Sequence, residues 1–186
     1  AARILGKSAE RPRRSILFLL VTGEERGLLG SDYFASYPTI PLAAIVANVN
    51  VDMPLLLTPT ADLVAFGADH SSLGLLTERA AKDNGFALIP DPMPEEVIFV
   101  RSDQYSFVRR GVPAIYLTAG SGSVDGGEAQ RKASAAFVAT NYHRPSDQLD
   151  LGADWPSVAR FTATEVELAR LIADADARPQ WNSGDF

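Results

Sequence analysis

The sequence predicts an α/β fold, in which a mostly parallel mixed sheet carries helices on both faces as a three-layer α/β/α arrangement. Short apolar runs alternate along the chain with segments of helical periodicity. The run at residues 15–22, SILFLLVT, is apolar without alternation, as in a strand covered on both faces. No repeat and no shift in composition divides the chain, so residues 1–186 are expected to form one domain with an irregular tail at residues 178–186.

The individual elements follow from periodicity and from end signals. Asp154 precedes a long amphipathic segment with Pro156 in its first turn, which is typical of a capped helix start. Ser71 or Ser72 is expected to cap another helix, which Gly85 ends. Helices are therefore expected at residues 1–6, 27–36, 71–84, 102–110 and 154–176, and strands at residues 15–22, 43–53, 63–66, 86–89 and 114–118.

The composition excludes several classes of function. Hydrophobic residues make up 46% of the chain and charged residues 22%, as in ordinary globular proteins. The net charge of -6 argues against a nucleic-acid partner, and the densest basic run, RPRR, is expected to be a solvated turn. No apolar stretch is long enough for a membrane span, so no membrane partner is expected. The absence of cysteine excludes disulfides, thiolate metal sites and a cysteine nucleophile.

Two common enzyme motifs are also missing. The glycine-rich stretch AGSGSVDGG at residues 119–127 lacks the Gly-Lys-Ser/Thr of a phosphate-binding loop. It contains no Gly-x-Ser-x-Gly elbow with a matching histidine, so a serine hydrolase is not indicated. Nucleotide binding and serine catalysis are therefore disfavoured.

Acidic side chains follow two of the predicted strands. Glu24 and Glu25 come directly after residues 15–22, and Asp52 lies at the end of the next predicted strand. In parallel sheets ligands bind at the carboxyl ends of strands. Zinc accepts carboxylate and imidazole ligands, so Glu25, Asp52 and His143 would make a metal site if they converge. Glu24 would then be free to act as a general base.

Each of these residues also has an ordinary explanation. Glu24 is suited to the first turn of the following helix, where the helix dipole favours an acid. Asp52 fits a turn, and His143 fits an exposed surface. Asp147 and Asp150 are expected either to orient the imidazole or to stabilise a turn. The order in which the residues occur is more informative than any one of them.

That order resembles a known family. The segments VTGEERGLLGSDYF, NVNVDMP, RSDQYSFVRRGVPAIYL and NYHRPSDQLD, in this sequence, closely resemble the co-catalytic zinc exopeptidases of the bacterial leucyl aminopeptidase type. These enzymes are related to glutamate carboxypeptidase II. The resemblance runs to about Ala173 and corresponds to roughly the C-terminal two thirds of the family's catalytic domain. It implies the same three-layer fold and a peptide substrate.

The resemblance also implies roles for single residues. Glu24 would be the general base that passes a proton to the leaving amine. Glu25 and His143 would ligate one zinc ion, and Asp52 the other. Tyr142 would hydrogen-bond the scissile carbonyl oxygen, a role that a phenol beside a metal can fill.

Arg101, Ser102 and Asp103 match a family segment that lines the substrate cleft. The alternative for this segment is a surface arginine before a short helix, with Ser102 as its N-cap. The function implied is an aminopeptidase that hydrolyses N-terminal peptide bonds with a metal-activated water. A non-catalytic domain on the same fold, a carboxypeptidase, or a glutaminyl cyclase-like member of the clan remains open.

The chain departs from the family at its metal site. The family uses a His-x-Asp motif and a bridging aspartate upstream of the segment that matches Ala1, and no His-x-Asp occurs here. His70, the other histidine, is expected at a helix start in a capping or surface role. A catalytic zinc needs three protein ligands, so two zinc ions are expected only in a longer parent and this chain alone is expected to be inactive.

Absence of the upstream strands would leave part of the sheet uncovered. We therefore expect the chain either to dimerise through exposed sheet surface, because unpaired edges promote association, or to be poorly ordered near its N-terminus. The sequence itself does not indicate a compartment. The resemblance implies that the parent is secreted or periplasmic.

Overall fold

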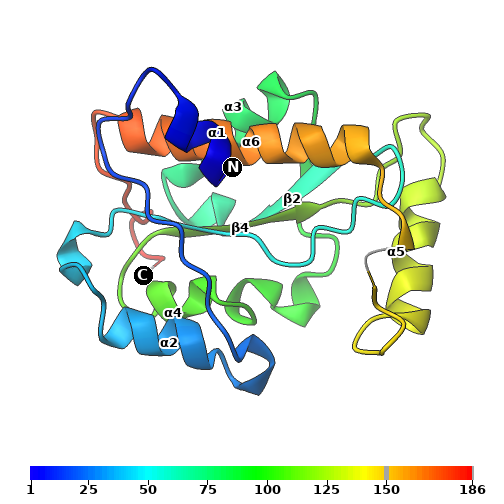
Figure 1. Cartoon of the computed structure of the whole chain (residues 1–186), viewed down its shortest axis with the longest axis horizontal. Helices are drawn as coiled ribbons and strands as arrows, with labels where there is room; N and C mark the ends of the chain where they lie inside the picture. Colours follow the sequence, from blue (N-terminus) through cyan, green and yellow to red (C-terminus); the bar gives the residue numbers. More distant parts are fainter. Residues whose placement is uncertain (149–150, 186) are drawn as a thin grey trace.

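The computed structural model describes residues 1–148 and 151–185, and its elements form three layers (Figure 1). Helices α3 (Leu73–Asp83) and α6 (Trp155–Asp174) lie on one face of the sheet. Helices α2 (Leu29–Ser36) and α4 (Gln104–Val108) lie on the opposite face. The three-layer α/β/α prediction is therefore confirmed.

The sheet has the strand order β1-β4-β2-β3. β1 (Asn48–Asn50) pairs in parallel with β4 (Ala114–Ala119). β2 (Asp62–Phe66) pairs antiparallel with β4 and in parallel with β3 (Ala87–Ile89). The sheet is mixed and mostly parallel, as predicted.

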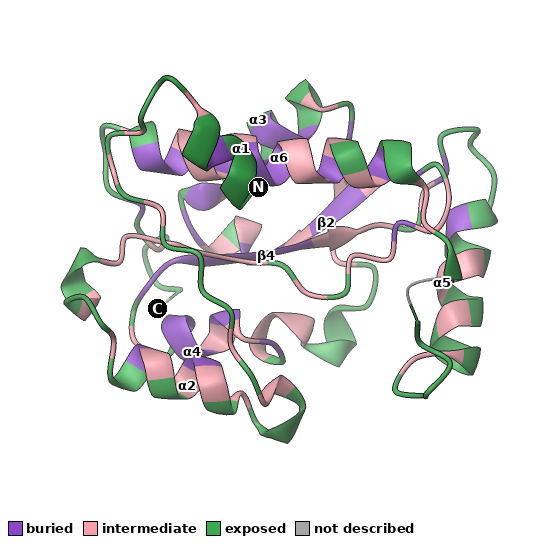
Figure 2. Cartoon of the chain, viewed as in Figure 1, coloured by how far each residue is buried: buried purple, intermediate pink, exposed green. Residues whose placement is uncertain are grey.

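The main core lies between the sheet and the α3/α6 layer. Leu63, Leu73, Ile115, Leu117 and Leu168 are fully buried there. Figure 2 shows this buried zone running through the sheet and the inward sides of α6 and α3. The continuous apolar run of β4 follows from this position, because a strand between two helical layers is covered on both faces.

The helix signals near the C-terminus are confirmed. The Asp154 carboxylate accepts a hydrogen bond of 2.9 Å from the Ser157 N–H, so it caps α6 as predicted. The residues 178–185 that follow form no helix. They are nevertheless attached to the body, since Trp181 bridges to Ser71 and the Asn182 N–H donates to the His70 carbonyl.

One further helix agrees with the sequence-based prediction, and another was not predicted. α1 (Ala2–Lys7) is close to the expected helix at residues 1–6. α5 (Ala129–Thr140) was not expected, because its sequence AQRKASAAFVAT has too few large apolar residues to form a stripe. In the structure only Gln130 of this helix is buried, and Figure 2 shows most of α5 exposed. No helix among the described residues has the length and apolarity to cross a membrane.

The predicted strand at residues 15–22 is wrong. The segment is extended but belongs to no sheet, and its side chains are largely exposed, with Leu17 at 54% and Leu20 at 92%. Within the described part of the chain, residues 15–21 form no backbone–backbone hydrogen bond. A β-strand needs a second strand with which it can form backbone hydrogen bonds, and the hydrophobicity of one segment does not show that such a partner is present. The strand expected at residues 43–53 is similarly reduced to the three residues of β1.

Glu165 on α6 is the one buried acid without an ion-pair partner among the described residues, and it makes stability depend on pH. Burial raises its pKa to about 8 from 4.5, and the N-terminal ammonium opposes the shift. Between these values the folded chain keeps a proton that the unfolded chain has lost. The free energy of unfolding should therefore fall as pH rises from about 5 to about 8, by up to about 1.4 kcal/mol per pH unit.

The substitution Glu165→Gln should remove this slope, because glutamine does not ionise. Urea unfolding at several pH values between 5 and 8 measures the slope for each protein. Glu78→Gln, at an exposed position of α3, serves as the control and should keep the wild-type slope. Equal slopes in wild type and Glu165→Gln would contradict the assignment.

Candidate active site

The two adjacent glutamates lie on a short 3₁₀ turn, η1 (Glu24–Arg26), after the extended segment. Gly23 has φ of 71°, a left-handed conformation that favours glycine, and it lets the chain turn sharply. The pKa of Glu24 is raised, first by burial and then by the negative charges of Asp52, Glu25 and Asp103. His143 opposes the shift. Glu24 is thus at the centre of an acidic group.

Asp52 is positioned by a series of polar side chains. Ser102 Oγ donates to Asp52 Oδ2 at 2.9 Å, and the Asn50 amide donates to Ser102 Oγ at 3.0 Å. The same Asn50 amide donates to Gln104 Oε1 at 2.8 Å. Since Ser102 and Gln104 are buried, these bonds hold Asp52 in one orientation beside the end of β1.

Tyr116 on β4 supports Asp52 from the other side. Its hydroxyl donates to the Asp52 carbonyl oxygen at 3.1 Å, and its ring packs against Phe66. Burial, together with the charges of Asp52 and Glu24, raises the pKa of Tyr116 far above its ordinary value. Tyr116 is therefore a permanent hydrogen-bond donor at this position.

His143 and Tyr142 reach the same acidic group from the loop after α5. The His143 Nε2 contacts the Glu25 carboxylate, and both side chains are more than half exposed. The Tyr142 ring stacks on the His143 ring with centroids 3.7 Å apart. Burial and the charges of Glu25, Glu24 and Asp52 raise the pKa of Tyr142, so its phenol stays protonated.

The three residues predicted to line the cleft, at positions 101–103, have different environments in the structure. Arg101 forms an ion pair with Glu96 at 3.0 Å, and its charge also lowers the pKa of Tyr142. Ser102 is occupied with Asp52 and is buried. Asp103 occupies the cap position of α4, and its Oδ1 is a buried oxygen without a hydrogen-bond partner. Arg101 alone of the three is exposed.

The donors have the chemistry that zinc prefers, but they do not make a complete site. Carboxylates and an imidazole are suitable ligands, and Asp103, which has an unpaired buried oxygen, is one of the carboxylates that raise the pKa of Glu24. Across residues 1–148 and 151–185, however, no three His, Asp or Glu side chains come close enough to hold one ion. The Glu25 carboxylate contacts His143, whereas the Asp52 carboxylate is hydrogen-bonded to Ser102.

Sequence reasoning missed Asn50, Gln104 and Tyr116. Asn48, Asn50 and Asp52 alternate in NVNVD, and this period of two could have indicated a polar strand face. No sequence signal indicates the role of Tyr116, because that role depends on the pairing of β4 with β1.

Two other predicted roles can be compared with the structure. His70 lies on the 3₁₀ turn Ala68–His70, near Asp185 and stacked on Phe99, which fits the expected surface role. Asp147 is in a turn, where its N–H donates to the Arg144 carbonyl. Asp150 lies outside the described residues.

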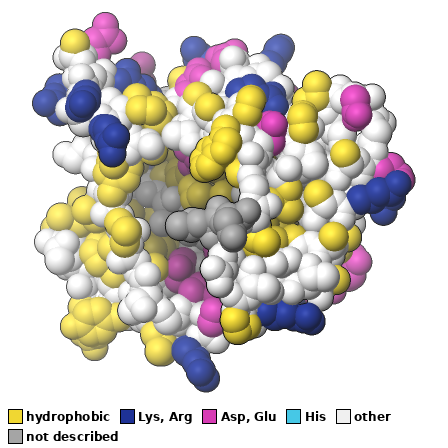
Figure 3. Space-filling view, turned by 45° about the vertical axis from the view of Figure 1, so that its right-hand side comes forward, with side chains coloured by type: hydrophobic (Ala, Val, Ile, Leu, Met, Phe, Trp, Pro, Cys, Tyr) yellow, Lys and Arg dark blue, Asp and Glu magenta, His cyan; other side chains and the backbone are white. Residues whose placement is uncertain are grey.

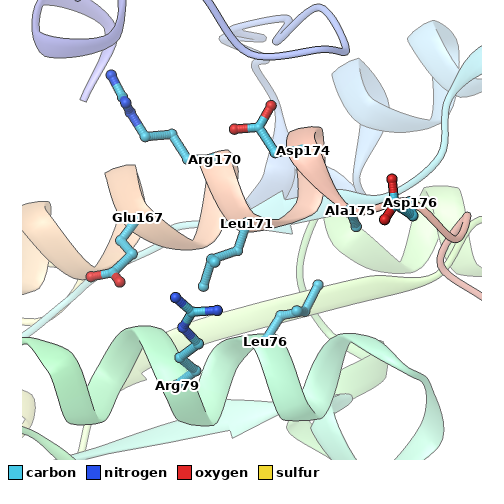
Figure 4. A pocket seen from close by; sticks show the side chains of 8 residues that line it. All are labelled: Leu76, Arg79, Glu167, Arg170, Leu171, Asp174, Ala175 and Asp176. Atoms are coloured by element: carbon cyan, nitrogen blue, oxygen red, sulfur yellow. The ribbon is translucent and has the colours of Figure 1, made fainter. Parts of the chain in front are cut away.

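A small pocket of about 440 Å³ between α3 and α6 is unrelated to this group (Figure 4). Leu171 and Glu167 project from α6 toward Arg79 and Leu76 of α3, whereas Arg170 and Asp174 point to the other side of α6. None of the predicted site residues lines it. The space-filling view shows a different, hollowed face, bordered by hydrophobic and acidic side chains (Figure 3).

The fold places the acidic group beside the carboxyl end of β1, the position at which α/β sheets bind their ligands. The model of peptidase family M28 matches residues 1–169. The chain therefore belongs to peptidase family M28, which confirms the resemblance found in the sequence. No curated protein sequence matches the chain.

Solved structures support the same fold. The aminopeptidase LapA of Legionella pneumophila superposes with a TM-score of 0.65 at 20% identity, over 95% of this chain and 44% of its own. An aminopeptidase from Aneurinibacillus sp. strain AM-1 gives 0.53 at 20% identity, over 85% and 33%. A Zn-dependent exopeptidase from Parabacteroides distasonis gives 0.50 at 15%, over 84% and 50%. The chain thus spans half or less of each neighbour.

The bond from Ser102 to Asp52 can be tested through stability. Ser102→Ala should lower the free energy of unfolding by about 1–3 kcal/mol, because it removes a buried partner of Asp52 and of Asn50. Ser121→Ala, at an exposed loop position, should change it by less than about 0.5 kcal/mol. Urea unfolding measures both, and equal small effects would show that Ser102 does not hold Asp52.

Proposed function

We propose that the protein of which these residues form the catalytic part is a metal-dependent aminopeptidase. It hydrolyses N-terminal peptide bonds, with Glu24 as the general base. The observation that carries this proposal is the position of Glu24, half-buried among Asp52, Glu25 and Asp103, with a raised pKa. A carboxyl with raised proton affinity in a site of titratable groups is suited to accept and return protons.

Zinc, held in the complete protein by Glu25 and His143 at one position and by Asp52 at the other, would lower the pKa of a water molecule. Glu24 would take the proton and deliver it to the leaving amine. Tyr142, kept protonated, would donate a hydrogen bond to the carbonyl oxygen as negative charge develops there. Arg101, exposed beside Tyr142, would contact the substrate or product, and Ser102 and Asp103 would shape the floor of the cleft.

A second reading, a non-catalytic domain on the same scaffold, is favoured by one observation. The described residues do not gather three ligands around one point. This reading and the enzyme reading make different predictions for the isolated chain and for a longer protein that contains it.

The isolated chain is expected to bind less than one zinc ion and to show no chelator-sensitive hydrolysis of leucine p-nitroanilide. The physical reason is that two protein ligands hold zinc weakly. Elemental mass spectrometry after dialysis against trace zinc gives the metal content, and absorbance gives the rate. Two ions per chain with turnover that a chelator abolishes would overturn the proposal that the chain alone is inactive.

In a longer protein that carries the remaining ligands, Glu24→Gln should lower kcat by about 10²–10⁴-fold while the zinc content stays unchanged. Arg131→Gln, on the exposed face of α5, is the matched control. A zinc-loaded parent that cleaves no aminoacyl anilide would support the non-catalytic reading.

A further inference from the structure

Helix α5 packs against the rest of the molecule with only one fully buried side chain. Figure 1 shows this helix at the side of the sheet, outside the two helical layers. Its residues are exposed or half-buried apart from Gln130, which lies in its first turn and is completely buried. Glutamine is seldom fully buried, and a buried amide needs hydrogen-bond partners for its oxygen and its nitrogen. The partners of Gln130 therefore show what holds α5 in place.

The side-chain amide of Gln130 makes four hydrogen bonds, which is its full capacity. Its Oε1 accepts from the Thr58 N–H at 3.3 Å and from the Thr58 hydroxyl at 2.9 Å. Its Nε2 donates to the Leu55 carbonyl at 2.5 Å and to Ser134 Oγ at 3.2 Å. The Gln130 N–H also donates to Ser123 Oγ at 2.9 Å, so the main chain is fixed as well.

These bonds join two segments that carry candidate site residues. Residues 55–58 begin three positions after Asp52, and α5 leads directly into Tyr142 and His143. Within the described part of the chain, Gln130 provides every hydrogen bond between α5 and residues 55–58. The orientation of α5 relative to the Asp52 segment thus depends on this one side chain.

The loop that follows α5 is bonded to the helix and to itself. The Tyr142 N–H donates to the Phe137 carbonyl at 3.1 Å, in the last turns of α5. The Asn141 amide donates to the Ser146 carbonyl at 2.8 Å, which closes the loop around His143. Because of these local bonds the loop should move together with the helix, so the direction of α5 determines where the phenol and the imidazole lie.

The length of α5 amplifies any change at its first turn. From Gln130 to Thr140 the helix rises by about 15 Å, so a rotation of about 10° at Gln130 moves its far end by about 3 Å. A movement of that size would separate the His143 imidazole from the Glu25 carboxylate. Their contact is between exposed side chains, and such pairs contribute little free energy, so it does not hold the helix by itself.

We propose that Gln130 is a positioning residue, which sets the place of Tyr142 and His143 relative to Asp52 by fixing the first turn of α5 to residues 55–58. The Gln130 side chain is hydrogen-bonded to none of these three site residues, so it acts through the helix. The placement is a property of the chain itself, whereas its effect on catalysis rests on the function proposed above.

Distances between spin labels test the placement in the 186-residue chain, which has no cysteine of its own. One label is attached at Lys82→Cys on α3, and the second at Arg144→Cys or at Ala135→Cys, all of them exposed positions. Gln130→Met keeps the length of the side chain and lacks the amide. It should shift or broaden the distance to position 144 by at least about 3 Å, and the distance to position 135 by at most about half as much.

A pair of substitutions at Thr58 separates the hydrogen bond from the packing. Thr58→Val removes the hydroxyl that donates to Gln130 and should change the distance to position 144 in the same way, by a smaller amount. Thr58→Ser keeps the hydroxyl and should give the wild-type distance. Lys132→Met, at an exposed position of α5, is the control and should also leave the distance unchanged.

Two outcomes would overturn the proposal. The first is an equal distance to position 144 in the wild-type chain and in Gln130→Met. The second is an equal change at positions 135 and 144, which would show that the whole helix loosens and does not turn about Gln130. If Gln130→Met unfolds the chain, Thr58→Val compared with Thr58→Ser decides the question in its place.

A longer, zinc-loaded protein allows a second measurement, the hydrolysis of leucine p-nitroanilide. Gln130→Met should lower kcat/KM by about 10²-fold, because small displacements of catalytic groups have effects of that size, and Lys132→Met should not lower it. Unchanged kcat/KM in Gln130→Met would overturn the role in catalysis. A wild-type protein without any hydrolysis would contradict the proposed function instead, and the label distances would still decide whether Gln130 positions His143.

Discussion

The pairing of β4 with two neighbours at once is the constraint on which the remaining structure depends. β1 pairs with it in parallel on one side and β2 antiparallel on the other. The strand also holds Asp52 through Tyr116, so the same element builds the core and positions the acid. Since Ala114, Ile115 and Leu117 are completely buried, the position of Asp52 depends on the best-packed part of the molecule.

The carboxylates of Glu24, Glu25, Asp52 and Asp103 lie near one another. Burial and neighbouring carboxylates both favour the protonated form of Glu24, and only His143 opposes them. Such a group is costly without a counter-charge, and the described residues contain no third ligand that would hold a cation. The described residues therefore bring several carboxylates together without a cation to balance their charge.

The sequence was sufficient to predict elements whose signals are local. β4 was expected at residues 114–118 and occupies Ala114–Ala119, and the Asp154 cap was found as expected. α5 was missed because small polar residues give no periodic stripe. Residues 15–22 were predicted as a strand from hydrophobicity, but pairing is a property of two segments and cannot be deduced from one.

The same distinction between local signals and long-range pairing applies to the candidate site. The meeting of Glu25 and His143, 118 positions apart, was expected from the order of motifs and not from any local rule. Asn50 and Tyr116 were missed because their roles exist only once β1 lies beside β4. The role of a residue that acts through a neighbouring strand can be recognised only once the position of that strand is known.

Residues 15–21 form an extended segment that is held in place at both ends. Arg14 binds the carbonyls of Ile172, Ala173 and Ala175 at the end of α6, and the Thr22 carbonyl accepts from the Gly30 N–H at 2.8 Å. A segment tied at two points has already lost most of its conformational freedom. These two attachments therefore keep residues 15–21 extended, although the segment pairs with no strand among the described residues.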